Sequence, residues 1–416
     1  MTISMRYMGT KRSLAASISD AISRRHPNAT ILDAFSGLCA VGSELAPKHV
    51  VFANDIHHFA ENVARSILLA PLRAQSISSV RDAMLPHYEE NLGALREAVG
   101  ELYDLEDRML ARANSDRGLT RFRLYALAQM AKSVPRRFHG LPTLERYKGS
   151  PQTFPYSLAT QYFSNAYFGL RQAMQIDSIR YAIDCVAVSS RARLLCALSQ
   201  AMSLCSASPG HFAQFFVPRD DANSALVVRM RRRDLFSAFV AALEAVKPIQ
   251  CYSRTSNRTF CSDATTLLET KRGYLSGLPL IVYADPPYSR AQYSRYYHLL
   301  ETIALYDYPA CDGKGRYRQD RHLTGFSHKA HVADAMDAFV SAASDTGAGL
   351  YFSYPSNGLL QRAGECVEDV LSTHYRHVSL LAEVPIRHST MGGAPGVAAY
   401  DALERIYFAS DDRRLH

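Results

Sequence analysis

The chain has 416 residues, of which 47% are hydrophobic and 21% are charged. This composition is typical of a folded globular protein and excludes a largely disordered chain. Lysine and arginine outnumber aspartate and glutamate by 47 to 39, which gives a formal charge of +8 and favours a polyanionic partner without requiring one.

The first predicted elements alternate between helix and strand. Apolar residues at helical intervals predict a helix over residues 11–26, and a short apolar strand over 30–35 follows. Residues 36–42 form a glycine turn that opens a helix. A second strand over 49–55 leads to a helix over about 59–69. This order predicts a parallel sheet that binds its ligands at the carboxyl ends of the strands.

A long stretch without clear strands comes next. Its helical patterns are separated by irregular segments rich in proline, tyrosine and phenylalanine, and we interpret residues 87–254 as an inserted, mainly helical domain. The helices are expected over 89–112, 120–133, 191–202 and 234–245.

Strand and helix patterns resume after the insertion. Strands are expected over 258–263, 280–284, 349–354, 377–384 and 403–409. The predicted fold class is therefore α/β, with a Rossmann-like, mostly parallel sheet covered by helices on both faces. Residues 1–86 and 255–416 would form this discontinuous domain.

The tetrad Asp285-Pro286-Pro287-Tyr288 directly follows the predicted strand over 280–284. The prolines fix the backbone and leave carbonyl groups free as acceptors, Asp285 adds a charged acceptor, and Tyr288 offers an aromatic face. These groups suit a planar base that carries an amino group. The alternative is an ordinary exit from a strand into a turn, since aspartate and proline are common turn residues.

A glycine turn and acidic residues mark the ends of other strands. Gly37, four residues after Asp33, lets the backbone pass close to a ligand, and the amides that open the next helix can receive a carboxylate. Such a turn alone also fits a dinucleotide site or a tight loop. Asp55 ends the second strand, where it can bond the hydroxyls of a ribose, and Asp263 ends a later strand, where it can accept from an adenine amino group.

The segment from Arg6 to Arg12 precedes the first helix. It contains the aromatic residue Tyr7 and the basic residue Lys11 on either side of Gly9. By itself the segment is also compatible with a simple helix start, in which Thr10 caps the helix.

Taken together, these segments resemble the Dam-like, alpha-group adenine-N6 DNA methyltransferases. The resemblance rests on the order of a YxGxK segment at 7–11, DxFxG at 33–37, an acidic strand end, a long insertion and DPPY. Residues 293–303, 352–354 and 404–407 also resemble later segments of that family. The resemblance covers about residues 5–70 and 255–410, so the target sequence that the insertion would read stays open.

The resemblance implies a methyltransferase fold and methyl transfer from S-adenosylmethionine to N6 of an adenine that is flipped out of double-stranded DNA. It further implies that residues 87–254 recognise the DNA target, and it suggests restriction or defence proteins as partners. Tyr288 would stack on the flipped base, while Asp285 and the Pro286 carbonyl accept the two N6 hydrogens. The implied catalytic residues are Asp285, Pro286, Pro287 and Tyr288, and the implied cofactor-binding residues are Tyr7, Lys11, Asp33, Phe35, Gly37, Asp55, Asp263 and Asp285.

Other functions remain open at this point. Methylation of cytosine N4 or of an RNA base uses the same chemistry, although DPPY in place of SPPY favours adenine. A binding module that keeps the fold without turnover belongs to another class, and the intact Asp285 and Tyr288 argue against it. A nicotinamide-dependent dehydrogenase would need a GxGxxG motif after the first strand, which this sequence lacks.

Further residues fit a functional or a structural role. His57 and His58 do not predict a metal site with Asp55, because adjacent histidines at a helix start point apart. His298 could touch substrate or be an ordinary helix histidine. Candidates for DNA contact are the basic runs 136–137 and 229–233, the aromatic residues between 154 and 168, and the loop over 387–396, but a solvated helix, a hydrophobic core and a plain glycine loop explain them as well.

Cysteine use and the amino-terminal residues bear on the cellular compartment. The eight cysteines include no CxxC pair, so neither a zinc ribbon nor a disulfide framework is predicted. The chain starts without an apolar signal core and contains no uninterrupted apolar run of membrane length. We therefore expect a cytoplasmic protein without a membrane or metal partner.

Overall fold

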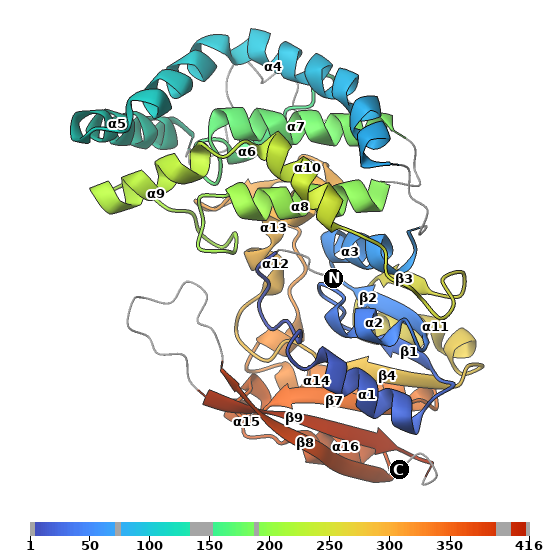
Figure 1. Ribbon diagram of the computed structural model, residues 1–416. Coiled ribbons are helices and arrows are strands. Elements are labelled where there is room, and N and C mark those ends of the chain that lie inside the picture. Colours follow the sequence, from blue (N-terminus) through green and yellow to red (C-terminus); the bar gives the residue numbers. More distant parts are fainter. Residues whose placement is uncertain (1–4, 71–75, 134–152, 187–190, 388–400, 413–416) are drawn as a thin grey trace. The chain divides into compact units, whose positions relative to one another are not determined.

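The computed structural model describes residues 5–70, 76–133, 153–186, 191–387 and 401–412 (Figure 1). The chain divides into two compact units. The helical unit comprises residues 1–7, 73–247 and 295–321, and the sheet unit comprises residues 8–72, 248–294 and 322–416. Arg136, Arg137 and the predicted loop from residue 388 onward lie outside the described residues.

The sheet unit contains a seven-stranded sheet in the order β3-β2-β1-β4-β7-β9-β8. Strands β1, β2, β3, β4 and β7 pair in parallel, whereas β9 runs antiparallel to both β7 and β8. The predicted α/β fold class with a mostly parallel sheet is confirmed. The strands are β1 Thr30–Asp33, β2 Val50–Asp55, β3 Arg258–Cys261, β4 Leu280–Ala284, β7 Gly349–Pro355, β8 His377–Arg387 and β9 Asp401–Ser410.

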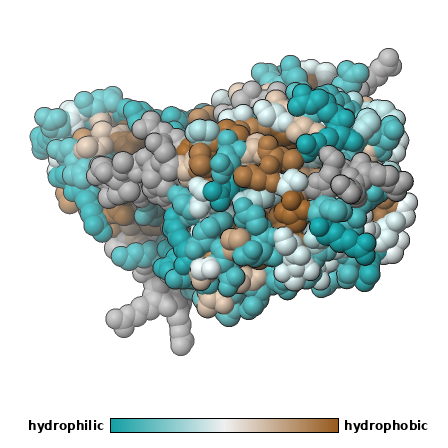
Figure 2. Space-filling view, turned by 90° about the horizontal axis from the view of Figure 1, so that it is seen from below, coloured by the Kyte–Doolittle hydropathy of each residue, from teal (hydrophilic) through white to brown (hydrophobic). Residues whose placement is uncertain are grey.

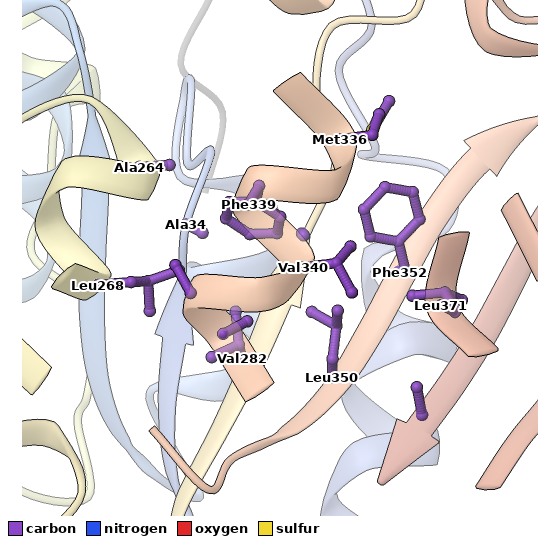
Figure 3. Close-up of a cluster of buried hydrophobic side chains, with 14 of the residues drawn as sticks. Ala34, Ala264, Leu268, Val282, Met336, Phe339, Val340, Leu350, Phe352 and Leu371 are labelled. Carbon is purple, nitrogen blue, oxygen red and sulfur yellow. The ribbon is translucent and has the colours of Figure 1, made fainter. Parts of the chain in front are cut away.

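One hydrophobic core of this unit lies against one face of the sheet. Val282 and Leu350, from the neighbouring strands β4 and β7, lie in one buried cluster with Leu268 and Phe339 (Figure 3). Leu32 of β1 belongs to the same cluster. Strands β1, β4 and β7 are buried along their whole length, which explains why their sequences are runs of apolar residues. The helices that contribute to this cluster are α11 Ala264–Leu275, α14 Val332–Asp345, α15 Leu359–Ala363 and α16 Val367–His374.

Helix α1 (Ala15–Arg25) covers the opposite face. It buries Ile18 and Ile22, and His26, which directly follows it, lies with Nε2 3.1 Å from the Tyr351 hydroxyl of β7. The His26 ring also packs 5.3 Å from that of Phe408 in β9. Helices therefore flank the sheet on both sides, as predicted. This unit also contains α2 Ala40–Leu45, α3 His58–Leu68 and the short 3-10 helix η3 Gly325–Ser327.

Strand β1 is shorter than the predicted strand over 30–35. The strand ends at Asp33. The amide of the next residue, Ala34, still donates a hydrogen bond to the Tyr283 carbonyl of β4 at 2.9 Å. The chain then turns, and the Ser36 amide bonds the Asn54 carbonyl at 2.8 Å. The apolar character of Ala34 and Phe35 reflects burial in the loop rather than a longer strand.

The helical unit is built around α7 (Leu170–Cys185), which contacts α4, α6, α8 and α10. Helices α4, α5, α8 and α10 confirm the four predicted helical stretches, whereas α6, α7 and α9 were not predicted. Helix α7 is buried on nearly all sides, so its sequence lacks the apolar stripe that marks a surface helix. The further elements of this unit are α4 Ile77–Arg112, α5 Asp116–Ser133, α6 Leu158–Phe163, α8 Arg191–Cys205, α9 Asp221–Arg231, α10 Leu235–Ala245, α13 His298–Leu305, and the hairpin of β5 Cys311–Asp312 with β6 Tyr317–Arg318. Helix α12 Tyr293–Tyr296 includes residues of both units.

The compact units have other boundaries than the predicted domains. The long segment of the helical unit runs from residue 73 to residue 247, and the unit also includes 1–7 and 295–321, two segments that the sequence assigned to the catalytic domain. The reason is that 295–321 packs on the helices: the Tyr306 hydroxyl donates to Asp177 of α7 at 2.6 Å. The functional division into a catalytic and a target-recognition domain stays a prediction.

Several ambiguous residues of the helical unit have structural partners. The buried His298 bonds the Phe212 carbonyl at 3.0 Å, and burial lowers its pKa to about 3. In the basic run, Arg231 is fully buried and pairs with Glu106 at 3.1 Å. The aromatic residues Tyr156, Tyr162, Phe163, Tyr167 and Phe168 are buried, whereas Phe154 is exposed.

The surface carries hydrophilic and hydrophobic areas, as the face in Figure 2 shows. Large exposed apolar side chains include Leu204, Tyr252 and Leu323. Across the described part of the chain, no helix has the length and apolar character needed to span a membrane. Within those same residues, no three side chains of His, Cys, Asp or Glu are grouped so that they could hold a metal ion.

Candidate functional site

Most of the predicted site residues of the sheet unit, namely Asp33, Phe35, Gly37, Asp55 and the tetrad 285–288, follow or end the strands β1, β2 and β4. Asp33 is the last residue of β1, and its register partner on β4 is Tyr283, two residues before Asp285. Strand β1 lies between β2 and β4, so the sheet order reverses at β1. In open α/β sheets, ligands bind in the crevice at such a switch point.

The glycine turn after β1 is fixed by the end of β2. Gly37 has a φ of +50°, a left-handed conformation that favours glycine. Its amide donates to Asp55 Oδ2 at 2.9 Å, while Asp55 Oδ1 accepts from the His57 amide at 2.9 Å. The neighbouring Asn54 donates through Nδ2 to the Ala34 carbonyl at 3.0 Å. The two polar residues at the end of β2 therefore set the shape of the turn.

Asp33 is a buried carboxylate with one backbone partner. Its Oδ2 accepts from the Gly42 amide at 3.2 Å, and its side chain is only 2% exposed. Burial raises the pKa of Asp33 to about 8, and the negative charges of Asp285 and Asp55 act in the same direction. A proton on Asp33 near neutral pH would reduce the negative charge in this region.

Phe35, the middle residue of the DxFxG motif, packs into the hydrophobic core. Its ring lies 5.4 Å from that of Phe326 and 5.2 Å from that of Phe339 on α14. Phe35 therefore fastens the loop between Asp33 and Gly37 to the helix layer.

Lys11 connects two carboxylates that are far apart in the sequence. Its Nζ lies 2.7 Å from Asp285 Oδ1 and 3.3 Å from Glu404 Oε1. Burial alone would lower the pKa of Lys11, but the charges of Asp285 and Glu404 outweigh it and raise that pKa. Burial raises the pKa of Asp285, and the Glu404 charge adds to this effect while Lys11 opposes it. Lys11 is thus held as a cation between the two side chains.

The remaining residues of the tetrad lie beside Lys11. Pro286 is buried, and Pro287 and Tyr288 are half-buried. The Lys11 Nζ lies 5.7 Å from the centre of the Tyr288 ring. Gly9, at a φ of +69°, lies against Tyr288 and Tyr293: an added Cβ would lie 3.4 Å from the Tyr288 ring and 2.7 Å from the Tyr293 hydroxyl. The YxGxK segment and the DPPY tetrad therefore meet through Gly9 and Lys11.

The remaining predicted cofactor residues, Tyr7 and Asp263, also have partners within the protein. Tyr7 belongs to the helical unit, where its ring stacks on that of Tyr297 with centroids 4.6 Å apart. Asp263 is the N-cap of α11, and its Oδ1 accepts from the Thr266 amide at 3.1 Å. Their contribution to cofactor binding stays a prediction.

Glu404 is the main residue of this region that was given no role from the sequence. It is fully buried in β9, where Ser353 of β7 donates a hydrogen bond to it. A signal was present: along β9 the alternate positions Ala402, Ile406 and Phe408 are apolar and buried, so a glutamate among them is exceptional.

Part of the chain is similar to proteins of known families. Residues 7–97 match the family model described as D12 class N6 adenine-specific DNA methyltransferase. The resemblance inferred from the sequence is thus confirmed, and the matched segment includes Lys11, the glycine turn and Asp55.

Three curated relatives carry names of the same kind. The chain is 38% identical over 122 residues to the type II methyltransferase M.FokI of Planomicrobium okeanokoites, a match that covers 29% of this chain and 17% of that protein. It is 23% identical over 334 residues to the modification methylase LlaI of Lactococcus lactis subsp. lactis, covering 78% of this chain and 42% of the relative. The type II methyltransferase M.NlaIII of Neisseria lactamica is 28% identical over 157 residues, with 34% of this chain and 44% of the relative covered. The segments of this chain that match therefore cover less than half the length of each of these relatives.

Proposed function

We propose that this chain, which matches the D12 class N6 adenine-specific DNA methyltransferases over residues 7–97, transfers a methyl group from S-adenosylmethionine to N6 of adenine at a specific DNA sequence. The observation that carries the proposal is the arrangement at the sheet edge. The tetrad from Asp285 to Tyr288 follows β4, directly beside the glycine turn that follows β1.

The donor site is proposed at the carboxyl ends of β1 and β2. The left-handed Gly37 leaves room for close approach to the backbone. Ser36 Oγ and Asn54 Oδ1 are buried and have no hydrogen-bond partner among the described residues, so polar groups are available to a ligand at this turn. When bound, S-adenosylmethionine supplies a methyl group carried by a positively charged sulfur. Its binding residues would be Tyr7, Lys11, Asp33, Phe35, Gly37, Asp55, Asp263 and Asp285.

The acceptor would be an adenine amino group. The N6 lone pair is delocalised into the ring, so the amine is a weak nucleophile, and in a duplex it is stacked out of reach. Asp285 and the Pro286 carbonyl would accept its two hydrogens and stabilise the positive charge that develops on nitrogen. Tyr288 would stack on the flipped base. Positioning and electrostatics would carry the rate. Asp285 is not assigned as a strong base, because the proton on N6 becomes acidic only after methyl transfer begins.

The biological context is also a proposal. The relatives are named as type II methyltransferases and as a modification methylase, and this supports a restriction or defence system in which a partner nuclease is a candidate. The helical unit would contribute target recognition. The excess of Lys and Arg over Asp and Glu, 47 to 39, is compatible with a DNA partner.

The test is to express the chain in cells whose DNA lacks methylated adenine and to sequence the genomic DNA by a modification-sensitive method. We expect N6-methyladenine at one recurring motif in cells with the wild-type chain and none in cells with Asp285→Asn. Methylated cytosine at N4 or label only in RNA would support the alternative substrates. Binding of S-adenosylmethionine by calorimetry without label in any nucleic acid would support a non-catalytic relative.

A further inference from the structure

Glu404 is an acidic side chain in an otherwise apolar strand face. Its backbone is fixed between two strands, since it pairs with Pro355 of β7 and Val384 of β8. The Ser353 hydroxyl donates to Oε1, and Oε2 is buried with no hydrogen-bond partner among the described residues. A charge held so rigidly away from water is costly unless a cation is close.

The nearby cation is Lys11, which Glu404 shares with Asp285. The Lys11 Nζ lies 2.7 Å from Asp285 and 3.3 Å from Glu404, and the Lys11 side chain is only 8% exposed. An ammonium carries three hydrogens, so it can bond both carboxylates at once. Because the Lys11 ammonium is buried, it interacts with these two carboxylates and hardly with solvent.

This division affects the chemistry proposed for Asp285. If Lys11 paired with Asp285 alone, the ammonium would neutralise the carboxylate that must stabilise positive charge on the substrate nitrogen. A second anion beside Lys11 attracts the same ammonium, so Lys11 stabilises the Asp285 carboxylate less and Asp285 stays a stronger hydrogen-bond acceptor.

We propose that Glu404 is a positioning residue that acts through Lys11. By pairing with the same ammonium, Glu404 weakens the interaction between Lys11 and Asp285, so Asp285 stays able to accept a hydrogen bond from the amino group of the substrate. The inference rests on the proposed methyl transfer for its kinetic consequence. The sharing of Lys11 itself does not depend on that function and can be measured on the protein alone.

The first measurement is the pKa of Asp285, which is determined by carbon NMR of protein that contains labelled aspartate. The signal of Asp285 is identified as the one that is lost in Asp285→Asn. The groups that face Asp285 are Lys11 from the amino-terminal segment, Glu404 from β9, Asp33 from β1 and Tyr283 from β4, the strand that precedes Asp285. In Glu404→Gln a nearby negative charge is lost, so we expect the pKa of Asp285 to fall by about one pH unit or more. An unchanged pKa would refute the coupling.

The second measurement is a double-mutant cycle of the single-turnover methylation rate with saturating donor and DNA. We expect Glu404→Gln to lower this rate on the order of tenfold. In a Lys11→Met background, the same substitution should change the rate less than about twofold, because the residue through which Glu404 acts is gone. An equal loss in both backgrounds, or no loss in either, would overturn the proposal.

Two further variants separate positioning from general stabilisation. Glu404→Asp keeps the negative charge, but its shorter side chain places the carboxylate farther from Lys11. The methylation rate of this variant should therefore lie between those of the wild type and Glu404→Gln. If Glu404→Gln does not fold, the double-mutant cycle of Glu404→Asp with Lys11→Met tests the coupling instead. Glu106→Gln is the matched control, because Glu106 is an equally buried glutamate that pairs with Arg231 in the helical unit. It should lower the melting temperature without changing the rate at saturation.

The two proposals fail in different ways. If the wild-type chain labels no nucleic acid, the proposed function is wrong, while the pKa of Asp285 in Glu404→Gln still decides whether Glu404 controls its charge. If the wild type methylates DNA and the cycle shows no coupling to Lys11, only the role of Glu404 is wrong.

Discussion

The carboxylate of Asp55 accepts a hydrogen bond from the Gly37 amide at 2.9 Å, and this bond joins the end of β2 to the turn that follows β1. The same side chain accepts from the His57 amide at 2.9 Å. Asp55 therefore shapes the proposed donor site even without a ligand, in addition to any bond with a ribose.

We expect Asp55→Ala to weaken S-adenosylmethionine binding by roughly tenfold or more, because both backbone bonds and the acceptor for the ribose are lost, each worth about 1–3 kcal/mol. Isothermal titration measures the dissociation constant. Asp55→Asn, which keeps one acceptor oxygen, should give a smaller loss. The control is Asp20→Ala, since Asp20 is exposed and pairs with Lys48 on the surface; an equal effect there would contradict the assignment.

Asp285→Ala should abolish methyl transfer, with a loss of at least about 10²–10³-fold in rate, because it removes a group that stabilises the developing charge. Folding should be largely retained, since Lys11 keeps Glu404 as an ionic partner at 3.3 Å. Transfer of radiolabelled methyl groups gives the rate, and circular dichroism gives the fold. A variant that still turns over at the wild-type rate would remove Asp285 from the mechanism.

Tyr288 offers a way to test base stacking separately from hydrogen bonding. Tyr288→Ala should lose about 1–3 kcal/mol of binding to the flipped base, whereas Tyr288→Phe keeps the ring and most of this energy. A duplex with 2-aminopurine at the target position reports extrusion through its fluorescence. If both variants flip the base as well as the wild type, the ring is not the stacking platform.

The buried Asp33 predicts a pH dependence of stability. Its folded-state pKa, raised from 3.8 to about 8, means that between these values the unfolded chain releases a proton that the folded chain retains. Folding stability should therefore fall as the pH rises through this window. Each tenfold difference in proton affinity is worth about 1.4 kcal/mol.

Asp33→Asn removes this titration and can still accept the bond from the Gly42 amide. Its melting temperature relative to the wild type should therefore increase between pH 4 and pH 8, as measured by scanning calorimetry. A constant difference across the range would show that Asp33 is not protonated in the folded protein.

The order of the strands along the chain was predictable from the sequence. Parallel strands buried on both faces, such as 280–284, read as continuous apolar runs, and this pattern is local. Helix α7 could not be found in the same way, since a helix that is buried on nearly all sides has no apolar stripe. The assignment of 295–321 to the helical unit likewise depended on distant contacts, such as the bond between Tyr306 and Asp177.

The sequence by itself determined which chemical groups end the strands, because the DxFxG turn, Asp55 and the DPPY tetrad are each read within a few residues. Only the tertiary structure decided how these groups interact. Lys11 and Asp285 are 274 residues apart, and Glu404 joins them only because β9 inserts antiparallel between β7 and β8. Strand order depends on packing across the whole sheet, so no local pattern reveals which buried charges become neighbours.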